Sequence, residues 1–270
     1  MCAYIDDVRT GAVVIGGFLL ALVACSGGPE GDTLESPAPS ATSTILPAAS
    51  DPSIPDVCLN ASIQVARFRT DDGVTLVAVV LGTGTRGVLL AHMGGAGQSL
   101  CNWLPFAQTL ASKGYLVLDL DLRGFGASGY GPGSRYDLDV LAGVGELRRR
   151  GAESVVLMGG SLGAIAVLVG GSGAQPPVDG IVSLSSPADP DILDVPAAVA
   201  DLRAPVLFVA AEDDGQFGRD ARTLYREAAS TDKALKIFPG FDHGIDLLRF
   251  DLADRTEKLI LSFLEDHPAA

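Results

Sequence analysis

Histidine is scarce in this chain, with three residues in 270. The sequence contains no His-Glu-x-x-His segment and no Cys-x-x-Cys segment, so the common zinc-binding motifs are absent. It also has no phosphate loop or dinucleotide fingerprint, because the glycine-rich residues 94–97 (GGAG) lack the lysine and the spacing of those motifs. We therefore expect a protein that needs no cofactor and no metal ion.

Positive charge is also in short supply. Lys and Arg number 19 against 33 Asp and Glu, which gives a formal net charge of −14. The one basic cluster, residues 148–150 (RRR), ends a predicted helix, where cations interact favourably with the helix dipole. Without a basic face, nucleic acid is not an expected partner. The hydrophobic content of 47% is enough for a full core, and one α/β domain is the default for this length.

The N-terminal apolar stretch, residues 11–24, is too short for a comfortable membrane span but has the length of a secretory h-region. It ends in residues 22–26 (LVACS), which resemble the lipobox of bacterial lipoproteins. The resemblance implies a signal peptide over 1–24, lipidation of Cys25 and anchoring at the outer face of the cell membrane. An uncleaved anchor and a plain secreted form are the alternatives. Asp6 and Asp7 against only Arg9 depart from the usual signal charge and leave a later translation start open.

Residues 25–57 are rich in Gly, Pro, Ser, Thr, Ala and Asp and contain few large apolar side chains. Such a composition does not bury enough surface to order itself, so we predict a disordered tether. The folded domain is then expected over residues 58–270.

The chain has four cysteines, an even number. If Cys2 leaves with the signal peptide and Cys25 carries the lipid, Cys58 and Cys101 remain in an oxidising compartment. We predict that they form a disulfide, which would stabilise the fold by about 4 kcal/mol in the chain-entropy model. Two buried thiols are the alternative.

Apolar segments with strand and helix character alternate along the domain. Two β-rich runs flank residues 71–73 (DDG), a turn that predicts an antiparallel hairpin. The later strands are almost continuously apolar, which predicts a mostly parallel, doubly wound α/β sheet of about eight strands with helices on both faces. About twenty residues separate the strand near Ser185 from the one at Val206, so a large lid is not expected. The predicted strands are 63–70, 74–81, 87–91, 115–119, 154–158, 180–184, 206–210 and 235–238, and the predicted helices are 103–112, 137–150, a segment from 161, 219–229 and 252–265.

Ser161 lies in residues 159–163 (GGSLG), between the apolar runs 155–158 and 164–169. A strand that turns directly into a helix crowds its own backbone, so positions without a Cβ are needed around the turn residue. The pattern makes Ser161 the candidate nucleophile.

A serine needs a base within hydrogen-bond reach, usually a histidine. His267 is close to the C-terminus and His92 follows an early strand, which leaves His243, after the last strand, as the candidate base. The carboxylate that orients such a histidine is expected in the acidic turn 212–215 (EDDG). We favour Asp214, with Asp213 and Asp242 as alternatives.

The order Ser161, Asp214, His243 resembles that of the α/β-hydrolase fold family, over about residues 60 to 266. Residues 89–95 (LLAHMGG) resemble the family's oxyanion loop, normally His-Gly-x, with Met93 as a departure. Residues 119–128 (DLDLRGFGAS) resemble its Asp-x-Arg-Gly-x-Gly-x-Ser segment.

The resemblance implies a serine esterase that acts on a small-molecule ester through an acyl-enzyme. The amides of Met93 and Leu162 would form the oxyanion hole, while His92, Asp121 and Arg123 would support the loops. We expect a monomer with a small or accessible ester substrate, similar to dienelactone-hydrolase-like members. A serine peptidase or amidase, and a lipoprotein that keeps the fold only for binding, are the alternatives.

Overall fold

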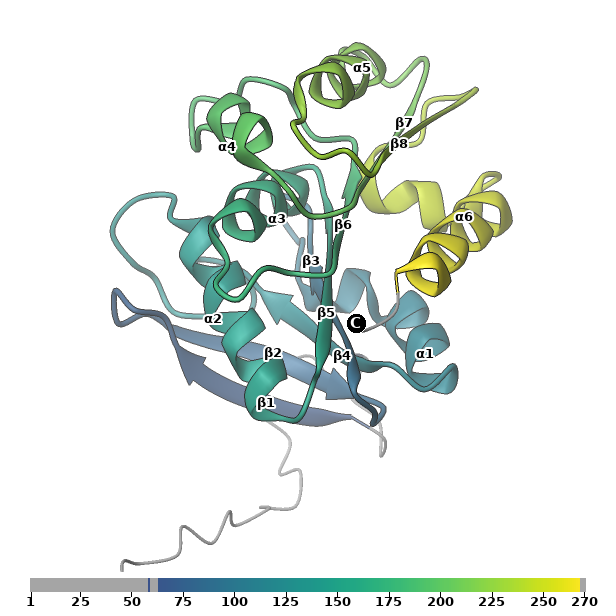
Figure 1. Ribbon diagram of the computed structural model, residues 1–270. Helices are drawn as coiled ribbons and strands as arrows, with labels where there is room; N and C mark the ends of the chain where they lie inside the picture. Colours follow the sequence, from purple (N-terminus) through teal and green to yellow (C-terminus); the bar gives the residue numbers. More distant parts are fainter. Residues whose placement is uncertain (1–57, 59–62, 268–270) are drawn as a thin grey trace, which may run out of the picture. The chain divides into compact units, whose positions relative to one another are not determined.

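The sheet of this protein has eight strands in the order β1-β2-β4-β3-β5-β6-β7-β8 (Figure 1). The computed structural model describes Cys58 and residues 63–267, so the predicted signal peptide, Cys25 and the tether lie outside the described residues. β1 pairs antiparallel with β2 and β2 with β4, and the remaining neighbours are parallel. The strands are β1 (Gln64–Arg69), β2 (Thr75–Leu81), β3 (Arg86–Ala91), β4 (Leu116–Asp121), β5 (Ser154–Gly160), β6 (Gly180–Leu184), β7 (Val206–Ala211) and β8 (Lys233–Phe238).

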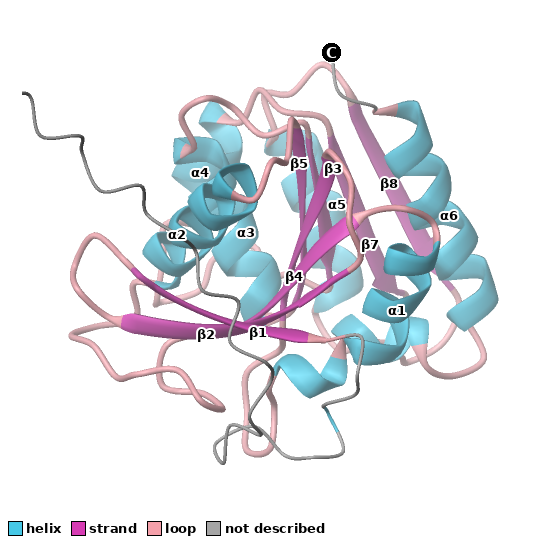
Figure 2. Ribbon diagram, turned by 90° about the horizontal axis from the view of Figure 1, so that it is seen from below, coloured by secondary structure: helices cyan, strands magenta, loops and turns pink. Residues whose placement is uncertain are grey.

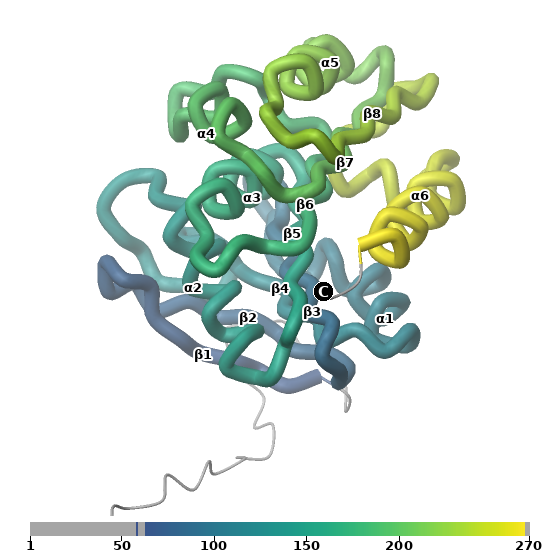
Figure 3. Tube along the Cα trace, in the orientation of Figure 1, coloured from purple at the N-terminus to yellow at the C-terminus, as the bar shows by residue number. Residues whose placement is uncertain are grey.

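Helices cover both faces of this sheet. α2, α3 and α4 lie on one face and α1 and α6 on the other, as two perpendicular views show (Figures 1 and 2). The Cα trace in Figure 3 follows the same division, with α5 beside α4. The helices are α1 (Leu104–Ser112), α2 (Tyr136–Arg149), α3 (Leu162–Gly173), α4 (Val195–Asp201), α5 (Phe217–Glu227) and α6 (Ala253–Asp266), with short 3-10 helices η2 (Leu100–Asn102) and η3 (Gly244–Leu248).

Two apolar clusters, one on each face, hold these layers together. On the face of α2 and α3, side chains such as Leu89 and Leu118 are buried against Val140 and Ile165. On the opposite face, Trp103 of the α1 region is 1% exposed and belongs to the second cluster. Because β3 to β7 are buried on both faces, their sequences are apolar at almost every position.

The predicted fold class is confirmed, with element boundaries that differ by a few residues. β5 continues to Gly160 because Gly160 still pairs with Leu184 of β6. The helices α4, η2 and η3 were not predicted, because all three are shorter than the window over which helical periodicity can be read. In the described residues, the connection from β6 to β7 holds only α4, a seven-residue helix.

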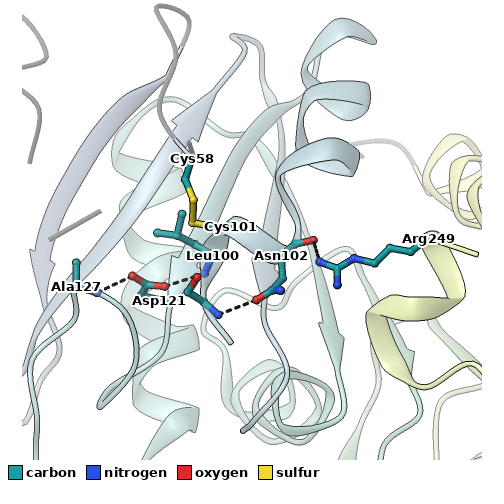
Figure 4. Close-up of a disulfide and its surroundings, with 8 residues drawn as sticks. Cys58, Leu100, Cys101, Asn102, Asp121, Ala127 and Arg249 are labelled. Carbon is teal, nitrogen blue, oxygen red and sulfur yellow. Dashed lines mark hydrogen bonds between the residues drawn. A yellow bond between two sulfur atoms is a disulfide. The ribbon is translucent and has the colours of Figure 1, made fainter. Parts of the chain in front are cut away.

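Cys58 and Cys101 form a disulfide with a Cα–Cα distance of 5.4 Å (Figure 4). Cys101 belongs to η2, in the connection that follows β3, so the bond fixes the start of the domain to that connection. The predicted pairing is therefore present in the structure. Among the described residues, no helix is both long and apolar enough to span a bilayer.

Candidate active site

Ser161 stands between the last residue of β5 and the first residue of α3. Its backbone has φ 50° and ψ −108°, a left-handed conformation that a serine adopts only under strain. A Cβ at Gly159 would collide with the carbonyl of Gly163, and one at Gly163 with the carbonyl of Ala91. The two glycines are therefore required by space, as the sequence pattern predicts, and they let Ser161 lie at the sharp turn before the N-terminus of α3.

His243 is joined to Asp214 by a hydrogen bond. The Nδ1 atom of His243 lies 2.8 Å from Oδ2 of Asp214, whose side chain is 10% exposed. A carboxylate only accepts hydrogen bonds, so Nδ1 carries the proton and Nε2 is left free to accept one. The ring of Phe217 packs 4.3 Å from the imidazole and limits its movement. The arrangement gives a histidine of fixed tautomer and orientation.

The alternative acids have other surroundings. Asp213 is exposed, and the neighbouring Glu212 forms an ion pair with Arg222. Asp242 has a pKa above its usual range, first because of burial and then because of nearby carboxylates. The structure therefore brings Asp214, rather than these residues, to His243. The remaining histidine, His267, ends α6 and contacts the carbonyl oxygen of Phe263.

The loop that carries His243 rests against the elbow of Ser161. The Cβ position of Gly160 lies 3.1 Å from the amide nitrogen of Ile245 and 3.4 Å from Cα of Gly244. The amide of Gly244 donates to Oγ of Ser185, at 3.1 Å, and the amide of Ile245 donates to Sδ of Met93, at 3.4 Å. Two successive amides are thus held by side chains that follow β6 and β3. These contacts fix the backbone directly after the histidine.

His92 shapes the loop after β3, as the resemblance implies. The amide of Leu122 donates to Nε2 at 3.1 Å, so Nδ1 carries the proton and donates to the carbonyl of Met93 at 2.7 Å. Burial lowers the pKa of His92 from 6.5 to about 4, although the bond to Met93 opposes this shift. The imidazole is therefore neutral at neutral pH and acts as a fixed bridge between two loops.

The same bond orients the peptide group between Met93 and Gly94. In a trans peptide, C=O and N–H point in opposite directions, so the amide of Gly94 points away from His92. A Cβ at Gly94 would lie 3.3 Å from the side chain of Leu162, the first residue of α3. Gly94 is thus a donor candidate beside the predicted amides of Met93 and Leu162. It was not predicted from the sequence, because the departure from the family pattern drew attention to Met93.

Asp121 and Arg123 bind the segment that follows β4 to the neighbouring loops and to α2. Asp121 accepts hydrogen bonds from the amides of Leu100 and Ala127, at 2.7 and 2.8 Å (Figure 4). Arg123 forms ion pairs with Asp139, at 2.8 Å, and with Asp72, at 2.7 Å. These carboxylates explain why the Asp-x-Arg-Gly segment is polar although it is buried.

Ser185, which binds the amide of Gly244, was also not predicted from the sequence. Ser161 and Ser185 are the only non-glycine residues with positive φ in the described part of the chain, and both follow strands at the carboxyl edge of the sheet. Active residues of parallel sheets gather at that edge, so a polar residue directly after β6 was the available signal.

A cavity of about 650 Å³ lies beside this region, between the loops that follow β3 and β4. Among the described residues, its lining includes Gln98, Leu100 and Phe125 but not Ser161, Asp214 or His243. Within the described residues, no group of three or more His, Cys, Asp or Glu side chains is arranged to hold a metal ion.

The fold is matched by known proteins. An esterase from Pyrococcus furiosus superposes with a TM-score of 0.64 at 15% identity, over 76% of this chain and 91% of that one. A monoacylglycerol lipase from Paleococcus ferrophilus gives 0.60 at 17% identity, over 72% and 99%. The esterase domain of a Rhodothermus marinus protein gives 0.61 at 21%, over 75% and 98%. A comparison with curated protein sequences finds no match. The family model for the alpha/beta hydrolase fold matches residues 87–226, more than half of the sequence, and the chain therefore belongs to the α/β hydrolase family.

Proposed function

We propose that this protein is a serine hydrolase that cleaves carboxylic esters through an acyl-enzyme intermediate. Oγ of Ser161 attacks the ester carbonyl carbon, and its proton passes to Nε2 of His243. The tetrahedral intermediate then expels the alcohol, which takes that proton from His243. Water attacks the remaining acyl-enzyme by the same route, and Ser161 is regenerated as the acid leaves.

Asp214 keeps His243 in the tautomer that this cycle needs and stabilises the imidazolium that forms in each half-reaction. The bond from Nδ1 of His243 to Oδ2 of Asp214 is the observation that carries the proposal, because it leaves Nε2 as the free proton acceptor. The strained backbone of Ser161 supports it independently.

The oxyanion that forms on the substrate needs preorganised donors. We assign this role to the amide of Leu162, at the N-terminus of α3, and to an amide of the Met93–Gly94 loop. Met93 is the donor that the sequence predicts, and the orientation of the Met93–Gly94 peptide supports Gly94 as a second one. Each such donor typically stabilises the transition state by about 3 kcal/mol.

Labelling with a fluorophosphonate probe tests the mechanism. We expect the wild-type chain to be labelled and Ser161→Ala to be unlabelled, with both variants equally folded by circular dichroism. An unlabelled wild-type domain would favour the non-catalytic binding protein. Labelling together with hydrolysis of amide but not ester substrates would favour the peptidase or amidase.

We further propose a small or accessible ester as substrate, as in dienelactone-hydrolase-like members. The short connection between β6 and β7 supports this, because a seven-residue helix offers little to cover the site. A series of p-nitrophenyl esters of increasing acyl length measures the preference. A rate that falls steeply beyond the shortest acyl chains would identify a small ester as the substrate, whereas a nearly constant rate would identify an accessible site. A requirement for long acyl chains would contradict the proposal.

We also propose export and lipidation at Cys25. The Cys58–Cys101 disulfide supports an oxidising compartment, where such bonds persist. Mass spectrometry of the protein made in a bacterial host should show a diacylglyceryl-modified N-terminus at Cys25, and Cys25→Ser should lose it and leave the membrane fraction. An unmodified N-terminus in the membrane fraction would favour an uncleaved anchor.

A further inference from the structure

Four large apolar side chains are exposed in the described part of the chain, and all four lie in connections that leave the carboxyl edge of the sheet. Tyr130 (87% exposed) follows β4, Ile192 (39%) follows β6, and Phe241 (77%) and Phe250 (61%) follow β8. This is the edge on which Ser161, Asp214 and His243 lie. Scattered exposed apolar residues are ordinary, so the relevant observation is that these four share the edge of the candidate site.

Three of these side chains lie in or next to segments that contact the site or the loops beside it. Phe241 stands two residues before His243. The ring of Tyr130 is 3.6 Å from the Cβ position of Gly124, which belongs to the wall of the 650 Å³ cavity. Phe250 follows Arg249, whose guanidinium donates to the carbonyl of Asn102 at 2.6 Å (Figure 4). Tyr130 and Phe241 thus belong to the connections that supply the cavity wall and the candidate base.

The N-terminal part of the chain joins the domain at the same edge. Cys58 is bonded to Cys101, which lies in the connection after β3 and contributes to the cavity wall. The 32 residues between Cys25 and Cys58 would span about 30 Å as a coil. A lipid on Cys25 would therefore keep the Cys58–Cys101 disulfide, and with it the connection after β3, within about this distance of the membrane surface.

The charge of this edge restricts the kind of lipid surface that it can approach. Asp214, Asp246 and Asp251 lie close enough to Asp242 to raise its pKa, after burial as the first cause. The whole chain carries a formal charge of −14. An anionic surface would repel this edge, whereas a surface of zwitterionic or uncharged lipids would not.

We propose that the carboxyl edge docks on a zwitterionic or uncharged lipid surface through Tyr130, Phe241, Phe250 and Ile192, and that the ester substrate is a lipid acyl ester drawn from that surface. The substrate part of this inference rests on the proposed hydrolase function, and the delivery part on the lipid at Cys25. Docking itself needs only the exposed apolar side chains.

Two variants of the full chain test the proposal. The first carries Tyr130→Ser, Phe241→Ser and Phe250→Ser, and the matched control carries Tyr130→Leu, Phe241→Leu and Phe250→Leu. Both are reconstituted in phosphatidylcholine vesicles and assayed on soluble p-nitrophenyl acetate and on p-nitrophenyl palmitate dissolved in the vesicles. Relative to wild type, the serine variant should hydrolyse the palmitate ester about tenfold or more slowly and the acetate ester at a rate within about twofold. The leucine control should keep the wild-type rate on both esters.

Hydrogen exchange on the same vesicles measures docking without turnover. Amides in residues 124–135 and 239–252 should be protected in the wild-type protein, unprotected in the serine variant, and less protected in phosphatidylglycerol vesicles. If wild type hydrolyses neither ester but these amides are protected, the hydrolase function fails and docking stands. If acetate is hydrolysed but the serine variant matches wild type in palmitate rate and in protection, the docking proposal is wrong.

Discussion

The amide of Gly244 donates to the hydroxyl of Ser185 across 59 residues of sequence, at 3.1 Å, and so fixes the residue next to His243. Loss of this hydroxyl should let the histidine loop shift relative to Ser161. Small displacements of catalytic groups are costly, so we expect Ser185→Ala to lower kcat by about tenfold with little change in KM.

Ser185→Gly is the companion variant, because glycine relieves the positive φ but also removes the hydroxyl. Its kcat should be as low as that of Ser185→Ala, and its unfolding temperature should be at least as high as that of Ser185→Ala. A Ser185→Ala enzyme with the wild-type kcat would show that the bond to Gly244 does not position His243.

The acid of the proposed triad can be separated from its neighbour by two isosteric substitutions. Asp214→Asn should lower kcat by about 10⁴-fold, because the amide no longer fixes the productive tautomer of His243. Asp213→Asn should stay close to wild type, since this side chain is exposed. Initial rates on one soluble ester suffice for both, and the reverse order of effects would assign the role to Asp213.

His92 should make the stability of the fold depend on pH. Burial lowers its pKa to about 4 in the folded protein, against the ordinary value of 6.5 that applies to the unfolded chain. Its contribution to stability is complete above pH 6.5 and is lost as the pH falls toward 4, because the unfolded chain takes up the proton first. Between pH 7 and pH 5 the free energy of unfolding should fall by about 2 kcal/mol from this residue alone.

Urea denaturation of wild type and His92→Gln at both pH values measures this contribution by difference. The variant should be less stable at pH 7 but should lose about 2 kcal/mol less on acidification, as groups common to both proteins cancel. Equal losses in the two proteins would mean that His92 is not buried in its neutral form.

Asp119 should destabilise the fold at neutral pH. Neither of its carboxylate oxygens has a hydrogen-bond partner among the described residues, and burial raises its pKa well above 3.8, with Asp121 as a further cause. A raised folded pKa means that the favourable contribution exists at low pH and is lost as the pH rises. Asp119→Asn should therefore unfold at a higher temperature than wild type at pH 8, with a smaller gap at pH 4. A lower melting temperature for the variant at pH 8 would contradict this assignment.

The disulfide should stabilise the domain by about 4 kcal/mol, since it joins two cysteines that are 43 residues apart in the sequence. Reductant should lower the unfolding temperature of the wild-type protein. The double variant Cys58→Ser/Cys101→Ser should melt at the reduced temperature whether or not reductant is present. A reductant-independent wild type would mean that the bond is absent in solution.

The sequence predicts most of the fold because its signals are local. Buried parallel strands such as 154–158 are continuous apolar runs, and the turn at 71–73 marks the hairpin. The elbow could be located because a turn from strand to helix leaves no room for a Cβ on either side of the serine. The glycines at 159 and 163 that meet this requirement lie within one five-residue motif. Asp214 could be favoured but not chosen, because three consecutive acids differ only in where the turn points their side chains.

The contacts that hold the site in place were not predictable in the same way. The bonds from Gly244 to Ser185 and from Ile245 to Met93 join segments 59 and 152 residues apart. Neither segment contains a sequence pattern that predicts its contact with the other. Likewise, the role of Gly94 depends on the direction of one peptide group, which is set by a hydrogen bond from His92.

The position of His243 after β8 has a consequence for the order in which function is acquired. Ser161 and Asp214 are synthesised before β8 and the loop that supplies the base, and β8 pairs with the sheet only through β7. A chain that stops short of His243 thus has the serine without a partner to remove its proton. Under the proposed mechanism, a nascent chain that lacks His243 is inert, and esterase activity reports that the final strand has docked.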